Sequence, residues 1–166
     1  MTASLQLTRS LGRVASIQRT LLRLSLRDTP GIELEWYYFL HSVNERKAIR
    51  KTDLISFNLL LEPTTGIDIL NRMIKAGLLD EKEDPSDRRA RLLRLTKKGQ
   101  FILKKAEESV QGVTTLLFDK VSEPQRSVME STLVAIENEF SPLLATHRPK
   151  TFDDLLQSYR HLTSVK

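Results

Sequence analysis

The chain has 166 residues, of which 40% are hydrophobic and 28% are charged, with a net charge of +5 and an isoelectric point near 9.6. This composition is ordinary for a globular domain and argues against wholesale disorder, and no stretch approaches the roughly 18 uncharged apolar residues that a membrane span needs. The chain has no cysteine, which excludes disulfides, thiolate metal sites and cysteine nucleophiles.

The first 27 residues carry five arginines and no acidic residue. Their apolar residues recur every three or four positions and so share one face of a predicted amphipathic helix: Leu7, Leu11, Val14, Ile17, Leu21 and Leu24. An organellar transit peptide has a similar composition and is the alternative, but we favour a helix that belongs to the fold. A secretory signal is not expected, because arginines interrupt every candidate apolar segment.

Three shorter helices are predicted after a break at Asp28-Thr29-Pro30-Gly31. They cover about residues 33–43, 52–61 and 63–76. Thr52 is a plausible N-cap of the second of them, and Pro63 suits the first turn of the third. Gly77 fits the position just past that helix, where a left-handed residue is needed.

A β-hairpin is predicted next, because the helical period stops at about residue 78. Residues 78–83 and 92–96 have the character of short strands, and Asp84-Pro85-Ser86-Asp87 between them is typical of a turn. Two short strands directly after a helix–turn–helix, in an otherwise helical chain, are the element order of a winged helix.

Two long helices are predicted to follow. Thr96 caps the first, and Ser122-Glu123-Pro124-Gln125 has the capping-box pattern that opens the second. Each carries a heptad-like apolar seam, composed of Leu103, Ala106, Val110, Val113 and Leu117 in the first and of Met129, Leu133, Ile136, Phe140 and Leu143 in the second. The two helices can pack on each other within one chain, but a homodimer accounts better for three long amphipathic helices.

We therefore expect a mainly α fold with a small β-hairpin wing, in four parts. Residues 1–32 are an N-terminal dimerisation helix, 33–98 a winged helix–turn–helix DNA-binding lobe, and 99–148 C-terminal dimerisation helices. Residues 149–166 form a tail that is either amphipathic or partly disordered.

The hairpin and the residues after it are strongly basic. Between residues 84 and 99 there are six lysines and arginines against two aspartates. Arginines at the tip of a hairpin can lie along a phosphate backbone or in a minor groove, and each phosphate that they neutralise makes binding salt-dependent. Asp87 is better suited to pair with a wing arginine such as Arg89, which would brace the hairpin. A solvated surface loop is the alternative for any such run of charge.

The string DPSDRRARLLRLTKKG, which follows ILNRMIKAGLLDEKE, resembles the MarR (multiple antibiotic resistance regulator) family over about residues 63–99, and the element order resembles it over about 33–145. The family's pattern is a recognition helix ending in Gly-Leu, a wing of the form D-x-x-D-R-R and a strand ending in L-T-x-x-G. The resemblance implies a homodimer that places two lobes on a palindromic operator in double-stranded DNA. It also implies that Asp87 and Arg89 form a structural pair and that Arg88 and Arg91 reach DNA.

The recognition helix both matches the family and departs from it. Its start at Pro63-Thr64-Thr65 is similar to the family's usual Ser/Thr start, and Asn71 and Arg72 stand at the family's polar–Arg pair. Hydroxyls and backbone amides at that start suit phosphate or base-edge contacts. Asp68, however, stands where the family commonly has Arg, which predicts repulsion by phosphates unless its carboxylate accepts a hydrogen bond from a cytosine amino group.

The resemblance further implies a cavity that takes a small aromatic or anionic effector. Tyr37 and His41 are candidates to line it, with Arg19 or Arg23 balancing an anion. The simpler interpretation, which we favour, is that Trp36 and its neighbours are core and interface residues. No metal site is expected, because the three histidines lack partners at ligand spacing.

No phosphate loop, dinucleotide fingerprint or nucleophile elbow is present in the sequence, so we expect neither an enzyme nor a cofactor. The expected protein is a cytoplasmic, homodimeric, sequence-specific transcriptional regulator, a repressor that a small ligand can release. The alternative is a dimeric winged-helix protein with weak or no DNA binding that serves a protein partner.

Overall fold

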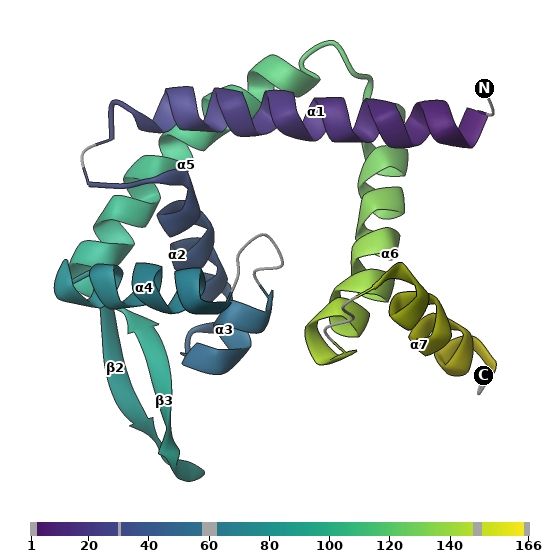
Figure 1. Ribbon diagram of the computed structural model, residues 1–166. Helices are drawn as coiled ribbons and strands as arrows, with labels where there is room; N and C mark the ends of the chain where they lie inside the picture. Colours follow the sequence, from purple (N-terminus) through teal and green to yellow (C-terminus); the bar gives the residue numbers. More distant parts are fainter. Residues whose placement is uncertain (1–2, 30, 58–62, 148–150, 165–166) are drawn as a thin grey trace.

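The computed structural model describes residues 3–29, 31–57, 63–147 and 151–164, and it is mainly helical with one small antiparallel sheet (Figure 1). The helices are α1 (Ala3–Leu26), α2 (Leu34–Arg46), α3 (Lys51–Phe57), α4 (Pro63–Lys75), α5 (Lys97–Phe118), α6 (Glu123–His147) and α7 (Phe152–Ser164). The strands β1 (Ile49–Arg50), β2 (Leu79–Asp84) and β3 (Asp87–Leu95) form a sheet in the order β1-β3-β2. This architecture confirms the predicted fold class.

The core of the central lobe lies where α2, α4 and the sheet meet. Phe39 and Leu40 of α2 lie four and three residues before Val43, so the three share one face of the helix, and each is almost completely buried. Leu70 and Met73 of α4 face them with no exposed surface. Burying one such side chain contributes about 1.5–3 kcal/mol, so this apolar face is what fixes α4 against α2.

The wing is longer than the sequence predicted, and the sheet has a third strand. β2 and β3 pair in antiparallel register from Leu79 opposite Leu95 to Glu83 opposite Arg91. The strand β1 lies on the other side of β3, with Ile49 opposite Leu93. It has only two residues, too few to produce a visible alternation, and therefore escaped prediction. The predicted cap at Thr52 is wrong, because α3 begins one residue earlier and includes it.

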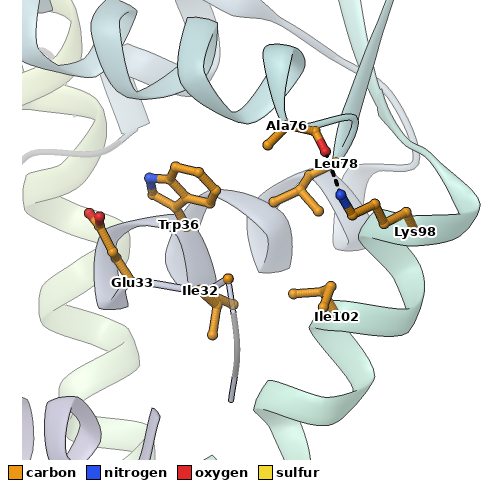
Figure 2. Close-up of a pocket in the computed structure, with 8 residues that line it drawn as sticks. Ile32, Glu33, Trp36, Ala76, Leu78, Lys98 and Ile102 are labelled. Carbon is orange, nitrogen blue, oxygen red and sulfur yellow. Dashed lines mark hydrogen bonds between the residues drawn. The ribbon is translucent and has the colours of Figure 1, made fainter. Parts of the chain in front are cut away.

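A compact joint connects α4, the wing and α5. Gly77 ends α4 with φ of +72°, which confirms the left-handed residue expected there. The Thr96 hydroxyl accepts a hydrogen bond from the Gly99 N–H at 2.9 Å, which confirms the predicted cap of α5, and donates to the Gly77 carbonyl at 2.6 Å. Lys98 Nζ donates to the Ala76 carbonyl at 2.8 Å (Figure 2), so this bond and the one from Thr96 to Gly77 hold the start of α5 against the end of α4.

The long helices bury much of the first predicted seam, whereas Met129, Leu133 and Ile136 of the second seam are exposed and Leu143 at its end is buried. Leu103, Ala106 and Val113 of α5 are buried, in contact with the core formed with α1 and α2. The helices α5 and α6 diverge instead of packing along each other (Figure 1). Large apolar side chains consequently stay exposed on α1 (Leu5, Leu7, Leu11, Val14, Ile17 and Leu24) and on α6 (Val128, Met129, Leu133, Val134 and Ile136).

The helices α6 and α7 begin with side-chain caps. The Gln125 side chain accepts hydrogen bonds from the Ser122 N–H and hydroxyl, as the capping-box pattern predicted. Thr151 and Asp154 form a reciprocal pair at the start of α7, in which each side chain accepts the other's backbone N–H. The tail is therefore an amphipathic helix over residues 152–164.

Candidate DNA-binding surface

The outer face of α4 carries mostly polar side chains because most of its apolar residues face the core. Ile69, Leu70 and Met73 are buried, whereas Thr64 and Thr65 in the first turn are exposed. A shallow hollow on this face is lined by Thr65, Asp68, Ile69, Asn71 and Arg72. The structure thus brings together four of the predicted DNA-contact residues, Thr64, Thr65, Asp68 and Arg72, on one exposed helix.

Asp68 lies at the middle of this face and is exposed. Among the described residues, no cation lies within ion-pair distance of its carboxylate, so none of them neutralises its charge. Ile67 beside it is 42% exposed although it is apolar. The face of α4 therefore offers hydroxyls, an amide and one unpaired negative charge.

Arg72 leans toward α2 instead of projecting outward from α4. Its Nη1 lies 3.9 Å from Oε1 of Glu33, and its guanidinium carbon lies 5.8 Å from the centroid of the Trp36 ring. An arginine within about 6 Å of an aromatic centroid gains a cation–π attraction of about 0.5–1 kcal/mol at an exposed site. Arg72 is thus held weakly by α2, at a position from which it can turn to a ligand.

Lys51 connects three elements beneath the recognition helix, a role that the sequence did not suggest. Its ammonium donates to Asn71 Oδ1 of α4 at 2.8 Å and to Glu81 Oε1 of β2 at 3.0 Å. The same residue opens α3. Lys51 therefore orients Asn71 and ties the wing to the helix–turn–helix.

Asp84 is the acidic residue that the described side chains place in a bracing position in the wing. It is 6% exposed, its Oδ2 accepts a hydrogen bond from Arg50 Nε at 2.8 Å, and the same oxygen lies 2.7 Å from Arg50 Nη2 in an ion pair. Its Oδ1 accepts from the Ser86 N–H and hydroxyl. The hydrogen bonds from Ser86 and then from Arg50 lower the pKa of Asp84 to about 2, and the same pair raises the pKa of Arg50.

A signal for Asp84 existed in the sequence. Asp at the first position of a turn commonly accepts from the backbone two residues on, as Asp84 does from Ser86. Its partner Arg50 lies 34 residues earlier in the chain, on a strand too short to predict. The predicted brace between Asp87 and Arg89 stays a prediction, because the side chains of Arg88 and Arg89 lie outside the described residues.

Arg91, the remaining predicted contact of the wing, is on β3 and exposed. Its Nη1 lies 3.4 Å from Oε1 of Glu83 across the hairpin, and both side chains are more than half exposed. An exposed pair of this kind contributes only about 0.2–1 kcal/mol and is screened by salt. Arg91 can therefore exchange Glu83 for a phosphate at little cost.

The residues predicted for an effector cavity form two groups, Tyr37 with His41 and Arg19 with Arg23. The Tyr37 ring, mostly buried, has its centroid 5.9 Å from that of His41, and burial raises the pKa of Tyr37. Arg23 pairs with Glu35 at 3.2 Å. Burial likewise raises the pKa of Tyr38, against the nearby charges of Arg19 and Arg23. Tyr38 stands between the two groups, 5.7 Å from Tyr37.

No helix in the described residues is long and apolar enough to cross a membrane. No group of three or more His, Asp or Glu residues in the same ranges is arranged to hold a metal ion.

Comparison with known proteins identifies the lobe built from α2 to the start of α5. Residues 34–99 match the model of a winged helix DNA-binding domain. The chain is also similar to an uncharacterized HTH-type transcriptional regulator, YsmB of Bacillus subtilis, with 23% identity over 108 residues that cover 65% of this chain and 69% of the relative.

Several solved structures share the fold over about four fifths of the chain. A MarR-family transcriptional regulator from Rhodococcus sp. RHA1 superposes with a TM-score of 0.72 and 20% identity, covering 82% of this chain and 95% of that one. CouR from Rhodococcus jostii RHA1, bound to p-coumaroyl-CoA, gives 0.71 and 22%, covering 82% and 94%. A mutant of MarR from E. coli complexed with operator DNA gives 0.68 and 21%, covering 79% and 93%. Residues 34–99 thus match a winged helix DNA-binding domain, and the chain has the fold of the MarR-family transcriptional regulators.

Proposed function

We propose that the protein is a homodimeric DNA-binding transcriptional regulator, and that it acts by binding rather than by catalysis. The observation that carries this proposal is the winged helix domain at residues 34–99, whose α4 presents an exposed polar face beside a basic wing. Operator DNA is bound by a structural relative, the E. coli MarR mutant. A regulator of this kind works beside its DNA, and we propose a cytoplasmic location on that ground.

In the proposed complex, the wing residues contribute mainly to DNA affinity and the α4 residues mainly to sequence specificity. Arg88, Arg89 and Arg91 of the wing contact phosphates or the minor groove, which is the salt-dependent part of binding. Thr64, Thr65, Asp68 and Arg72 meet base edges or phosphates in the major groove. We retain Asp87 as a further brace of the wing, beside the Arg50–Asp84 pair.

The proposal of a homodimer rests on the apolar faces of α1 and α6. Leu7, Leu11, Leu133 and Ile136 are among the large apolar side chains exposed on these two helices. Monomeric proteins rarely expose large contiguous apolar patches, and interfaces between copies are the usual explanation. We propose that residues 1–32 and 99–148 form the dimer interface, while 33–98 bind DNA and 149–166 are a tail. Two-fold symmetry then requires a palindromic operator.

The direct test is an electrophoretic mobility shift of the full chain on the DNA upstream of its own gene, at low and at moderate salt. We expect a shift that weakens as salt rises, because each phosphate contact releases counterions. Failure to shift the DNA at low salt contradicts the proposal. The exposed carboxylate of Asp68 then favours the second candidate, a winged-helix dimer that binds a protein partner.

Repression and its release by a small ligand are further parts of the proposal. Among the structural relatives, CouR is bound to p-coumaroyl-CoA, which supports a ligand-responsive regulator. Tyr37, His41, Arg19 and Arg23 remain the candidates suggested by the sequence for an effector site. A reporter gene under the chain's own upstream region tests repression, since deletion of the regulator should then raise reporter output.

A further inference from the structure

Asn71 of α4 lies on the exposed face of the recognition helix, yet the proposed DNA contacts do not include it. It is exposed and lines the shallow hollow together with Thr65 and Asp68. Leu70 and Met73 on either side of it have no exposed surface, so the rotation of α4 about its own axis is fixed by the core. Asn71 is therefore held on the side of α4 that the proposed function turns toward the major groove.

The amide of Asn71 has a defined orientation because its neighbour can only donate. Lys51 Nζ lies 2.8 Å from Asn71 Oδ1. A lysine ammonium has three donors and no acceptor, so it pairs with the amide oxygen and cannot pair with the amide nitrogen. No group of the described residues accepts a hydrogen bond from Asn71 Nδ2. Asn71 thus uses its oxygen on Lys51 and keeps the two N–H donors of its nitrogen available.

The ammonium of Lys51 is itself held in place by the sheet. It donates to Glu81 Oε1 at 3.0 Å, and the side chains of Lys51 and Glu81 are only 25% and 32% exposed. Glu81 of β2 stands opposite Leu93 of β3, which stands opposite Ile49 of β1 on its other side. Lys51 follows Ile49 by two residues, and Leu93 is completely buried. The orientation of the Asn71 amide therefore depends on a fixed row of the sheet and not on α4 alone.

The base edges in a major groove distinguish an asparagine that offers only donors. Asparagine reads adenine through two hydrogen bonds, because its nitrogen donates to N7 and its oxygen accepts from the N6 amino group. Guanine presents two acceptors there, O6 and N7, and thymine presents one acceptor beside a methyl group. An adenine amino group brought to the Asn71 oxygen would meet the Lys51 ammonium, which is a second donor. The arrangement therefore matches guanine.

We propose that Asn71 reads a guanine in each half-site of the DNA, and that Lys51 is the positioning residue that sets this preference over adenine. The amide nitrogen of Asn71 donates to the guanine acceptors, while Lys51 holds the amide oxygen and acts through Asn71. This inference rests on the proposed function, because it needs α4 to lie in a major groove. It adds a specificity-determining residue to that function and names a base of the operator.

The test is selection of binding sites by the full chain from a library of DNA duplexes of randomised sequence, read by sequencing the bound DNA. We expect the wild type to prefer guanine over adenine about fivefold or more at one position of each half-site, as a matched base contact provides. Asn71→Ala should abolish the preference at that position alone. Lys51→Met should shift the preference there from guanine toward adenine, because the released amide oxygen can then accept from the N6 amino group. Lys51→Arg keeps a donor beside Asn71 and should retain guanine.

Glu81→Gln is the matched control. It removes the ion pair of Lys51 with the wing but leaves Lys51 beside Asn71, so guanine should still be preferred. If Lys51 served only to tie the wing to the helix–turn–helix, Glu81→Gln and Lys51→Met would alter the base preference alike. Thermal unfolding of each variant confirms that it is folded, and Lys51→Ala replaces Lys51→Met if that variant does not fold.

Three results overturn the inference: a base other than guanine is preferred at the position that depends on Asn71, Asn71→Ala changes no position, or removal of the Lys51 ammonium leaves the guanine preference intact. Each of them leaves the proposed function standing, because DNA is then bound without this contact. A wild type that enriches no sequence and shifts no DNA at low salt overturns the proposed function and the inference together.

Discussion

Arg50 and Asp84, 34 residues apart in the chain, form the ion pair that fastens the wing to the helix–turn–helix. Two guanidinium nitrogens lie 2.7 and 2.8 Å from one carboxylate oxygen, and Asp84 is 6% exposed. Because β1 lies directly after α2 and before α3, this pair joins the tip of the hairpin to the elements that position α4. The orientation of the wing arginines therefore depends on a contact outside the wing.

Asp84→Asn should lower the free energy of unfolding at neutral pH, because the variant cannot form the ion pair. The pKa of Asp84 is lowered from 3.8 to about 2, so the ionised form favours the folded state. Its contribution is complete above pH 3.8 and disappears as the pH falls through about 2. Urea unfolding of wild type and variant across this window should show the two curves converging. Asp80→Asn on the same strand is the control, because Asp80 is exposed and forms only a long ion pair of 3.9 Å with Lys82. Equal losses of unfolding free energy in the two variants would refute the special role of Asp84.

Gly99→Ala should destabilise the protein although it lies in a helix. A Cβ at this position would overlap the backbone carbonyl oxygen of Leu78, and overpacking of this kind costs about 1–3 kcal/mol. Gly112→Ala in the same helix meets nothing within 4 Å and should stabilise by about 0.5–1 kcal/mol. Thermal unfolding of both variants measures the two changes in stability, which should have opposite signs. Two changes of the same sign would mean that the backbone of Leu78 does not pack closely against Gly99.

Arg88→Ala and Arg91→Ala should weaken binding to all DNA sequences about equally. Each should also reduce the slope of log affinity against log salt by about one, because one phosphate contact is lost. Fluorescence anisotropy at several salt concentrations gives the slope. Arg126→Ala on α6, where Arg126 pairs with Glu123, serves as the control with an unchanged slope. Slopes that match the wild type in both wing variants would remove the wing from the interface.

Asp68→Asn should raise overall DNA affinity a few-fold, because an unpaired negative charge no longer faces the phosphates. A unit charge about 4 Å from another contributes about 1 kcal/mol in water. Thr65→Ala, one turn earlier on the same face, should change sequence preference instead. Competition binding with a randomised operator library separates the two effects. Weaker binding by Asp68→Asn would show that the carboxylate makes a specific contact, for which a cytosine amino group is the expected partner.

Leu11→Glu and Leu133→Glu should convert the protein to a monomer. Both side chains are exposed on the apolar faces of α1 and α6, and a charge buried in a dimer interface is unfavourable. Light scattering after size exclusion gives the mass in solution. Phe152→Glu changes an exposed apolar residue of α7 outside the proposed interface and should leave the mass unchanged. A wild-type protein that is already monomeric would contradict the proposed assembly.

The elements that the sequence predicted well are those whose signals are local. The apolar spacing of α2 and α4, the cap at Thr96 and the left-handed Gly77 each depend on a few neighbouring residues, and each is present. The resemblance carried by residues 63–99 is confirmed by the winged helix match over 34–99 and by the shared fold. Local rules therefore sufficed for the fold class.

The features that prediction missed depend on residues far apart in the chain. Arg50 meets Asp84, Lys51 meets Asn71 and Glu81, and no spacing rule connects these positions. A pocket lined by Ile32, Trp36, Leu78 and Lys98 (Figure 2) combines residues from three separate segments, whereas the sequence predicted Tyr37 and His41, which lie on one helix, as pocket residues. Such sites exist only after the chain has folded, which is why sequence patterns did not locate them.

The joint at Thr96 has a mechanical consequence. Because hydrogen bonds tie the Thr96 hydroxyl to Gly77 and the Lys98 ammonium to Ala76, α4 and α5 meet at a fixed corner. A rotation of α5 therefore moves α4 with it. In a dimer of this chain, the tilt of α5 then sets the distance between the two copies of α4. The spacing of the DNA half-sites that such a dimer can bind thus depends on α5, a helix that need not contact DNA.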